Sequence, residues 1–207
     1  MALFRWLKRQ KQSRGHGVHS PFAFDLITKV IHSPHSYYAF YDIAAMLREQ
    51  GLDPGLITPF NHLSFRLLRY FNSKNVLEIN SGKGINTLFL MAAVPNIDCT
   101  CVEEDMASVV SSLAMHEEEP HEEEPHYKGP FDAIFLNEGG VNLPTIEELL
   151  EWSHEESFWV LHSIRKGAGK QLWKKIVIDE RINVTFETRE TGVVFPWPLL
   201  TPSRYLV

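Results

Sequence analysis

The chain has 207 residues, of which 44% are hydrophobic and 12% aromatic, a globular composition that excludes a disordered or fibrous protein. Its net charge is −6, but six of its 26 acidic residues lie at 117–119 and 122–124, and the other 20 match the 20 basic residues. This near-neutral remainder gives no electrostatic basis for binding nucleic acid. No apolar run approaches the ~20 residues that span a bilayer and no signal-peptide pattern is present, so we expect a cytoplasmic protein without a membrane span.

Residues 1–57 are predicted to form an N-terminal helical extension or lid. Residues 1–14 carry five basic residues and no acidic one, interleaved with apolar residues. This pattern fits a helix on a membrane surface or anionic partner, and it also fits a solvated helix that packs on the domain or a sister subunit. Ser20 before Pro21 predicts a helix start. The tyrosine-rich helix expected over 36–50 favours core or subunit interface, and hence a homodimer through the N-terminal helices.

The single domain expected over 58–207 opens with a helix over 58–71 and is organised around residues 75–104. This stretch is predicted to contain a strand over 75–79, a turn with Gly82 and Gly84, a helix over 85–94 and a strand over 98–102. Such a βαβ unit implies a parallel sheet with a right-handed crossover. The glycine turn would let a ligand reach the helix N-terminus, and Glu103, closing the second strand, is placed to accept hydrogen bonds from a ribose.

Two nucleotide-binding motifs fit this turn poorly. The dinucleotide fingerprint requires a third glycine, where this chain has Thr87. A P-loop requires a serine or threonine after its lysine and a glycine upstream, whereas Lys83 is followed by Gly84 and the upstream glycine is absent. We therefore reject the P-loop.

The two cysteines, Cys99 and Cys101, lie on the predicted strand 98–102. We expect them to point to opposite faces and to be buried free thiols in a reducing compartment.

Beyond residue 104 a helix is predicted over 106–115. It is followed at 116–125 by HEEEP repeated in tandem, which fits either a divalent-ion site or an extended, solvated loop. Further strands are expected over 131–136 and 157–161, with helices over 144–152 and 169–178. A hairpin is predicted from 183–187 and 192–195, and an edge strand or packed tail from 204–207. This alternation predicts an α/β fold, a three-layer αβα sandwich.

Taken together, these motifs resemble the class I methyltransferases that use S-adenosylmethionine (SAM), close to the small bacterial O-methyltransferase-like group. Their first motif is an acid at the end of the first strand followed by alternating glycines, and Glu78-x-Asn80-x-Gly82-x-Gly84 matches it with asparagine replacing the first glycine. Asparagine tolerates a positive φ, so the turn can survive this change. The resemblance covers most of the chain and implies a Rossmann-like fold with a mostly parallel sheet, a C-terminal β-hairpin and a reduced third strand.

The resemblance also implies a cofactor, SAM, and a small-molecule acceptor. The cofactor-binding residues it implies are Glu78, Asn80, Ser81, Gly82, Lys83, Gly84, Glu103 and Asn137. SAM carries no phosphate, so close backbone approach and a carboxylate for its ribose suit it better than a cationic cradle.

Three differences from the metal-dependent relatives bear on catalysis. Residues 106–130 are short for a helix and a third strand. Asn137 replaces an aspartate, and His162 and Ser163 replace paired aspartates. A hard cation prefers carboxylate oxygens, so we expect no catalytic Mg²⁺ and no other metal. His162 is the candidate general base, although a structural histidine fits the position as well.

Two functions remain open. One is a methyltransferase that acts on a small molecule, and the other is an inactive methyltransferase-fold protein that serves as a binding module. The second is favoured by the substitutions at positions where function is most demanding, and the first by the retention of Gly82, Gly84 and Glu103.

Overall fold

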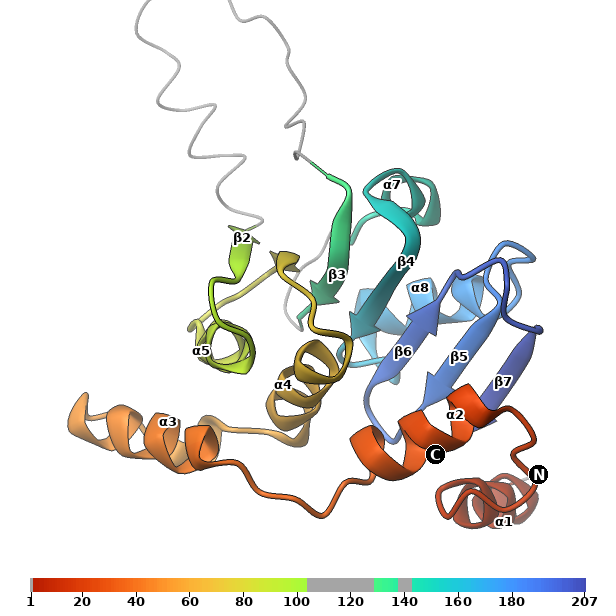
Figure 1. Cartoon of the computed structure of the whole chain (residues 1–207), viewed down its shortest axis with the longest axis horizontal. Coiled ribbons are helices and arrows are strands. Elements are labelled where there is room, and N and C mark those ends of the chain that lie inside the picture. Colours follow the sequence, from red (N-terminus) through yellow and green to blue (C-terminus); the bar gives the residue numbers. More distant parts are fainter. Residues whose placement is uncertain (1, 104–128, 138–142) are drawn as a thin grey trace, which may run out of the picture.

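The computed structural model describes residues 2–103, 129–137 and 143–207 (Figure 1). Its centre is a seven-stranded sheet in the order β2-β1-β3-β4-β6-β5-β7. The strands are β1 (Asn75–Ile79), β2 (Asp98–Val102), β3 (Phe131–Leu136), β4 (Ser153–Leu161), β5 (Val184–Glu187), β6 (Gly192–Phe195) and β7 (Ser203–Leu206). The predicted fold class is confirmed, and β4 begins four residues before the predicted strand, within a polar stretch that periodicity could not reveal.

The strand directions confirm the predicted sheet. β1 lies inside it, parallel to both β2 and β3, and β3 is parallel to β4. β6 runs antiparallel to β4 and β5, which is the predicted hairpin. β7 adds a parallel edge strand beside β5, as expected for the end of the chain.

Helices cover both faces of the sheet. They are α1 (Ala2–Gln12), α2 (Pro21–Asp25), η1 (Leu26–Ile31), α3 (Tyr38–Glu49), η2 (Pro54–Leu56), α4 (Pro59–Phe71), α5 (Ile85–Ala93), α7 (Ile146–Glu151) and α8 (Gly167–Ile176). In Figure 1, α4 and α5 lie in front of the sheet and α8 lies behind it. None of the helices in the described residues is long and apolar enough to cross a bilayer.

The three layers follow from the alternation of side chains along each strand. In β3, Ala133 and Phe135 face the core under α4 and α5, whereas Ile134 and Leu136 face the core under α7 and α8. Every second residue of β4 divides in the same way. Strands that are apolar on both faces are typical of a parallel sheet buried between helices.

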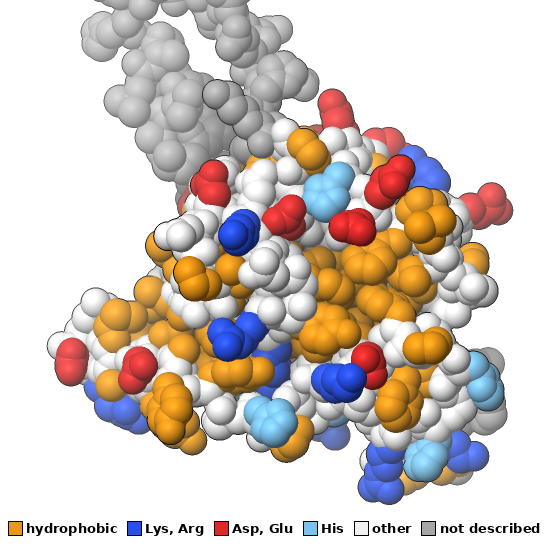
Figure 2. Space-filling view, viewed as in Figure 1, with side chains coloured by type: hydrophobic (Ala, Val, Ile, Leu, Met, Phe, Trp, Pro, Cys, Tyr) orange, Lys and Arg blue, Asp and Glu red, His pale blue; other side chains and the backbone are white. Residues whose placement is uncertain are grey.

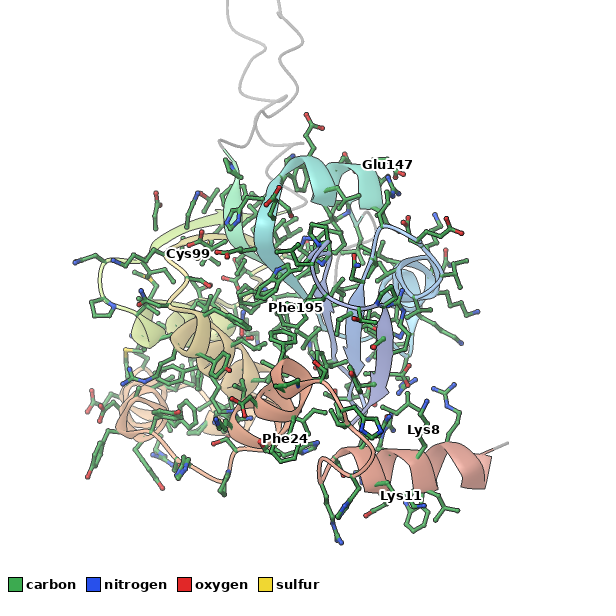
Figure 3. All side chains as sticks on the ribbon, turned by 45° about the vertical axis from the view of Figure 1, so that its right-hand side comes forward. Lys8, Lys11, Phe24, Cys99, Glu147 and Phe195 are labelled. Carbon is green, nitrogen blue, oxygen red and sulfur yellow. The ribbon has the colours of Figure 1, made fainter. Side chains whose placement is uncertain are left out.

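The N-terminal helices share the first of these cores. The hydroxyl of Ser20 accepts a hydrogen bond from the backbone N–H of Ala23, which confirms the predicted helix start. Beyond α2 the chain widens into a π-helix, η1, a departure that apolar periodicity does not reveal. Phe22 packs edge-on against Phe195 of β6, with ring centroids 5.1 Å apart, and Figure 3 shows Phe195 in the interior.

Helix α1 is held against the C-terminal strands. Arg5 and Arg9 both pair with the carboxylate of Glu187, at 2.7 and 3.3 Å, and the backbone N–H of Leu206 donates to the side chain of Gln12. Figure 3 shows α1, with Lys8 and Lys11 labelled, at the end of the molecule opposite Glu147 on α7.

The predicted helix 106–115 and the HEEEP repeat at 116–125 lie outside the described residues. Within the described part of the chain, β2 forms one edge of the sheet.

Candidate functional site

Four polar residues come directly after four neighbouring strands. In spatial order they are Glu103, Asn80, Asn137 and His162, which follow β2, β1, β3 and β4. The backbone N–H groups of Asn80, Asn137 and His162 each donate to the last carbonyl of the adjacent strand, at 2.8, 3.0 and 2.9 Å. The ladder therefore continues one residue past the strands and fixes these residues in a row. The row lies at the carboxyl edge where the strand order reverses, the usual ligand site of such sheets.

The turn after β1 takes left-handed backbone conformations. Asn80, Gly82 and Gly84 have φ values of 59°, 58° and 71°, so asparagine does adopt the conformation predicted for it. A Cβ added to Gly82 would meet no atom within 4 Å, which leaves open space beside the turn. Asn80 is buried, and within the described residues its side-chain Nδ2 has no hydrogen-bond partner. A buried donor without an acceptor, beside open space, is suited to receive a ligand oxygen.

Glu78 is fully buried beneath this turn, and its carboxylate is held mainly by three side chains, with a weaker contact of 3.7 Å from the thiol of Cys101. Its Oε1 accepts hydrogen bonds from the amides of Asn86 and Asn137, at 2.9 and 2.7 Å, and its Oε2 accepts one from the hydroxyl of Thr87, at 2.6 Å. These bonds offset the cost of burying a charge. Glu78 and Asn137, both expected to bind the cofactor, therefore lie in contact, and they are hydrogen-bonded to each other. Asn86 and Thr87 were not predicted, although two polar residues in the first turn of an apolar helix were a usable signal.

Glu103 bends back towards the glycine turn. Its Oε1 accepts hydrogen bonds from the hydroxyl of Ser81 and from the backbone N–H of Gly82, the latter at 2.9 Å. Lys83 is exposed on the same turn. The structure therefore brings Ser81, Gly82 and Glu103 together, as the motif spacing implied.

A polar chain links this turn to the start of α4. The amide of Asn86 bonds Glu78, the side-chain oxygen of Asn86 accepts from Asn61 at 3.3 Å, and Asn61 in turn accepts from the backbone N–H and the hydroxyl of Thr58. Thr58 is the N-cap residue of α4, so the hydrogen bonds that begin this helix are part of the site.

His162 lines a cavity of about 650 Å³ between α1, the start of α4 and the turn of the β5–β6 hairpin. Its ring stacks on that of Phe60, with centroids 4.5 Å apart and an interplanar angle of 16°. Ser163 beside it is buried with φ 58°. The apolar walls include Trp6, Ile31, Phe60, Leu63 and Val207, and the charged ones Arg9, Arg66, Arg189 and Glu190. None of the residues of the glycine turn lines this cavity, so the site has two parts along one edge.

One group of three potential metal ligands occurs among the described residues, formed by Glu78, Cys99 and Cys101. Partial burial and the nearby charge of Glu78 raise the pKa of both thiols, and the Glu78 oxygens already accept hydrogen bonds. Two protonated thiols and one engaged carboxylate do not suit Mg²⁺, which prefers oxygen ligands. The absence of a catalytic Mg²⁺ stays a prediction.

The prediction that the cysteines point to opposite faces was wrong. Both are free, but their sulfur atoms lie 3.9 Å apart, because residues two apart in a strand share a face. They are also less buried than expected: Cys99 is half-buried and Cys101 is exposed on the edge strand β2.

No known family model matches the sequence, and no curated protein matches it. Among solved structures, the SAH-bound Podospora anserina methyltransferase PaMTH1 is similar to 85% of this chain over 96% of its own, with 12% identity and a TM-score of 0.50. The Bacillus cereus O-methyltransferase in complex with SAH covers 81% of this chain and 94% of its own, with 12% identity and a TM-score of 0.48. The O-methyltransferase TomG from Streptomyces achromogenes, in complex with SAM, covers 78% and 91%, with 15% identity and a TM-score of 0.46.

The likeness to the Podospora protein extends over nearly the whole of that chain and agrees with the sheet order and the hairpin described above. The chain therefore has the Rossmann-like α/β fold of the class I methyltransferases.

Proposed function

We propose that this protein is a SAM-dependent methyltransferase that acts on a small-molecule acceptor. The observation that carries the proposal is the turn after β1. There Nδ2 of Asn80 has no hydrogen-bond partner among the described residues, Gly82 borders open space, and the carboxylate of Glu103 contacts the backbone of the turn. The Podospora methyltransferase of the same fold was crystallised with SAH. When bound, SAM supplies a methyl group on a sulfonium, which the acceptor attacks in line.

The residues of the turn fit this cofactor. Asn80 would donate to it, and the backbone at Gly82 and Gly84 permits its close approach. Glu103 would accept hydrogen bonds from the ribose hydroxyls, exchanging its contacts with Ser81 and Gly82 for them. Glu78 and Asn137 would contribute indirectly, because their hydrogen bond stabilises the conformation of the turn.

His162 is our candidate for accepting the proton that the acceptor loses. It follows β4 on the same edge and lines the cavity in which an acceptor would lie. Its stacking on Phe60 fixes the plane of the ring. The acceptor loses a proton and gains a methyl group, so a side chain at this place that takes up the proton would complete the balance of the reaction.

The segment 1–57 would serve as a lid over the domain 58–207, since α1 forms one wall of the cavity. We also propose a homodimer through the N-terminal helices and a cytoplasmic location, which the free thiols of Cys99 and Cys101 favour.

Titration calorimetry with SAH tests the cofactor. We expect binding, and we expect Glu103→Ala to weaken it by about 1–3 kcal/mol, the usual cost of leaving polar groups unpaired. Glu156→Ala is the matched control, because this exposed carboxylate lies in β4 near the opposite edge of the sheet. No heat at millimolar SAH would refute the proposal.

The alternative is an inactive binding module of the same fold. It is favoured by the hydrogen bonds that Glu103 accepts from Ser81 and Gly82. These donors of the protein already occupy the carboxylate oxygen that a ribose would need. A crystal soaked with SAH separates the two. Ligand density between Gly82 and Glu103 supports the enzyme, and an unchanged Ser81–Glu103 contact at saturating SAH supports the module.

A further inference from the structure

The cavity beside His162 has an unbalanced charge. Among the described residues, three arginines, Arg9, Arg66 and Arg189, line it, against one carboxylate, Glu190. The rest of its wall is largely apolar. Charged groups in an apolar cavity interact strongly with a ligand, because little water screens them.

Arg66 is the most buried of these three cations. Its one hydrogen bond is a long contact of 3.3 Å to the carbonyl of Ile31, and its buried Nε has no partner among the described residues. Burial lowers the pKa of Arg66, and no carboxylate in the described part of the chain lies within ion-pairing distance of it. By contrast, Arg181 pairs with two carboxylates, and Arg204 donates to four backbone carbonyls.

Arg9 adds a second donor to the same cavity. It shares the carboxylate of Glu187 with Arg5 and Arg165, so three positive charges meet one negative charge. Its buried Nε also lacks a partner among the described residues. Together with Nδ2 of Asn80, these Nε atoms are the three buried side-chain atoms without a hydrogen-bond partner in the described residues, and all three are donors.

We propose that this cavity binds an amphipathic anion, a small molecule with an apolar ring or chain and one acidic group, which Arg66 and Arg9 hold. The inference rests on the proposed function, because it names the class of the acceptor. Burying an unpaired guanidinium is costly, and a carboxylate or phosphate in bidentate contact would offset that cost. A volume of about 650 Å³ suits a molecule of one or two rings.

The same arrangement gives the acceptor an orientation. Arg66 and Phe60 both lie in α4 and both line the cavity, and the ring of His162 stacks on Phe60. With its acid at Arg66, a bound molecule would lay its apolar body against Phe60 and Leu63. The group to be methylated would then face His162 at the strand edge.

The test uses two fluorescent probes that share a ring system. One is the anion 8-anilinonaphthalene-1-sulfonate and the other is neutral N-phenyl-1-naphthylamine. We expect the full-length protein to bind the anion at least about tenfold more tightly than the neutral probe. Arg66→Met should reduce the affinity for the anion about tenfold and leave that for the neutral probe unchanged. Gln10→Trp, which narrows the cavity from the exposed side of α1, should weaken both.

Arg69→Met is the matched control, since Arg69 lies on the same helix but is exposed and stacks over Tyr37. It should leave the binding of both probes unchanged. Competition with benzoate and with phenyl phosphate distinguishes a carboxylate from a phosphate as the acidic group of the ligand. The competitor that carries the preferred group should displace the anionic probe at the lower concentration.

The melting temperature of Arg66→Met decides between a ligand-binding and a structural arginine. We expect it to equal or exceed that of the original protein, since an unpaired buried charge is removed. A lower melting temperature with unchanged probe binding would overturn the inference, as would equal affinity for the two probes. SAH calorimetry on the same variant keeps the proposals apart: SAH binding without anion preference refutes only the acceptor class, and the reverse refutes only the cofactor.

Discussion

At the scale of single residues, Glu78 and Asn80 differ from the roles that the motif implies. Glu78 serves the structure of the turn, and Asn80 is the residue available to a ligand. The sequence places Glu78 among the cofactor ligands, yet it is fully buried and both of its oxygens accept hydrogen bonds from the protein. Asn80, which stands where the motif has a glycine, supplies a buried donor that has no partner among the described residues. The substitution thus keeps the backbone conformation and adds a polar group.

Glu78→Gln should therefore reduce stability. The change replaces a carboxylate oxygen by an N–H group that faces donors from Asn86, Thr87 or Asn137, and an unsatisfied buried group costs about 1–3 kcal/mol. Urea unfolding measures the change, with exposed Glu156→Gln as the control. Equal unfolding free energies for Glu78→Gln and the control would show that the network has no structural role.

Gly169 is a second residue on which the site depends. A Cβ at this position would lie 2.9 Å from the carbonyl oxygen of Ser163 and 3.0 Å from that of His162. Gly169→Ala should therefore push the turn after β4 away from α8, at a cost of about 1–3 kcal/mol from overpacking. Thermal unfolding measures the loss, and Ala168→Gly, at the neighbouring position, is the control. A melting temperature equal to that of the original protein would contradict the close approach.

At the scale of elements, the regular part of the fold was predictable. β1, β2 and β3 have the predicted bounds, because each is a short apolar run that ends at a turn. The partners of Glu78 and the charge of the cavity were not predictable, since Arg9, Arg66 and Arg189 come from three separate parts of the chain. Only the packing of α1 and α4 against the hairpin turn brings them together. The shared face of Cys99 and Cys101 was predictable from the sequence, because residues two apart in a strand point to the same side.

The ion pairs of α1 share one carboxylate, that of Glu187, so the attachment of this helix depends in part on pH. Burial raises the pKa of Glu187, but Arg165, with Trp173 and Arg5, outweighs this effect and lowers it below its ordinary value. A carboxyl whose pKa is lower in the folded state stabilises the protein above its unfolded-state pKa of about 4.3, and this contribution is lost as the pH falls through the folded value.

Glu187→Gln should thus cost about 1–2 kcal/mol at pH 7, after allowing for solvent around the partly exposed arginines. The difference in unfolding free energy between the variant and the original protein should shrink as the pH is lowered from 6 to 3. Trypsin should also cut the variant faster within α1 at pH 7. A difference independent of pH would show that the charge of Glu187 does not hold the helix.

At the scale of the whole molecule, the helices of residues 1–57 expose apolar side chains. On α3, Tyr38 and Tyr41 are 90% and 65% exposed, and Trp6 and Leu7 of α1 are also exposed. Figure 2 shows apolar side chains at the surface of the arm that α3 forms in Figure 1. Exposed aromatic groups on adjacent turns are typical of an interface between subunits.

Light scattering after size-exclusion chromatography should therefore give the mass of a dimer. Replacing Tyr38 and Tyr41 together by serine should shift the protein towards the monomer without changing its circular dichroism. Tyr70→Ser, at an exposed position on α4, is the control. A monomer at every concentration would contradict the dimer and favour the role of these helices as a lid alone.

The contacts between α1 and the last strands join residues that are far apart in sequence. Arg5 and Glu187 are 182 positions apart, and Gln12 and Leu206 are 194 apart. The entropy of closing so long a loop opposes these contacts until the sheet has formed and brought β5 and β7 into place. Since α1 precedes in the chain the strands that it contacts, we expect it to dock after they have formed. A nascent chain can thus complete the βαβ unit and its glycine turn while the cavity still lacks the wall that α1 forms. The two parts of the site would then form at different times.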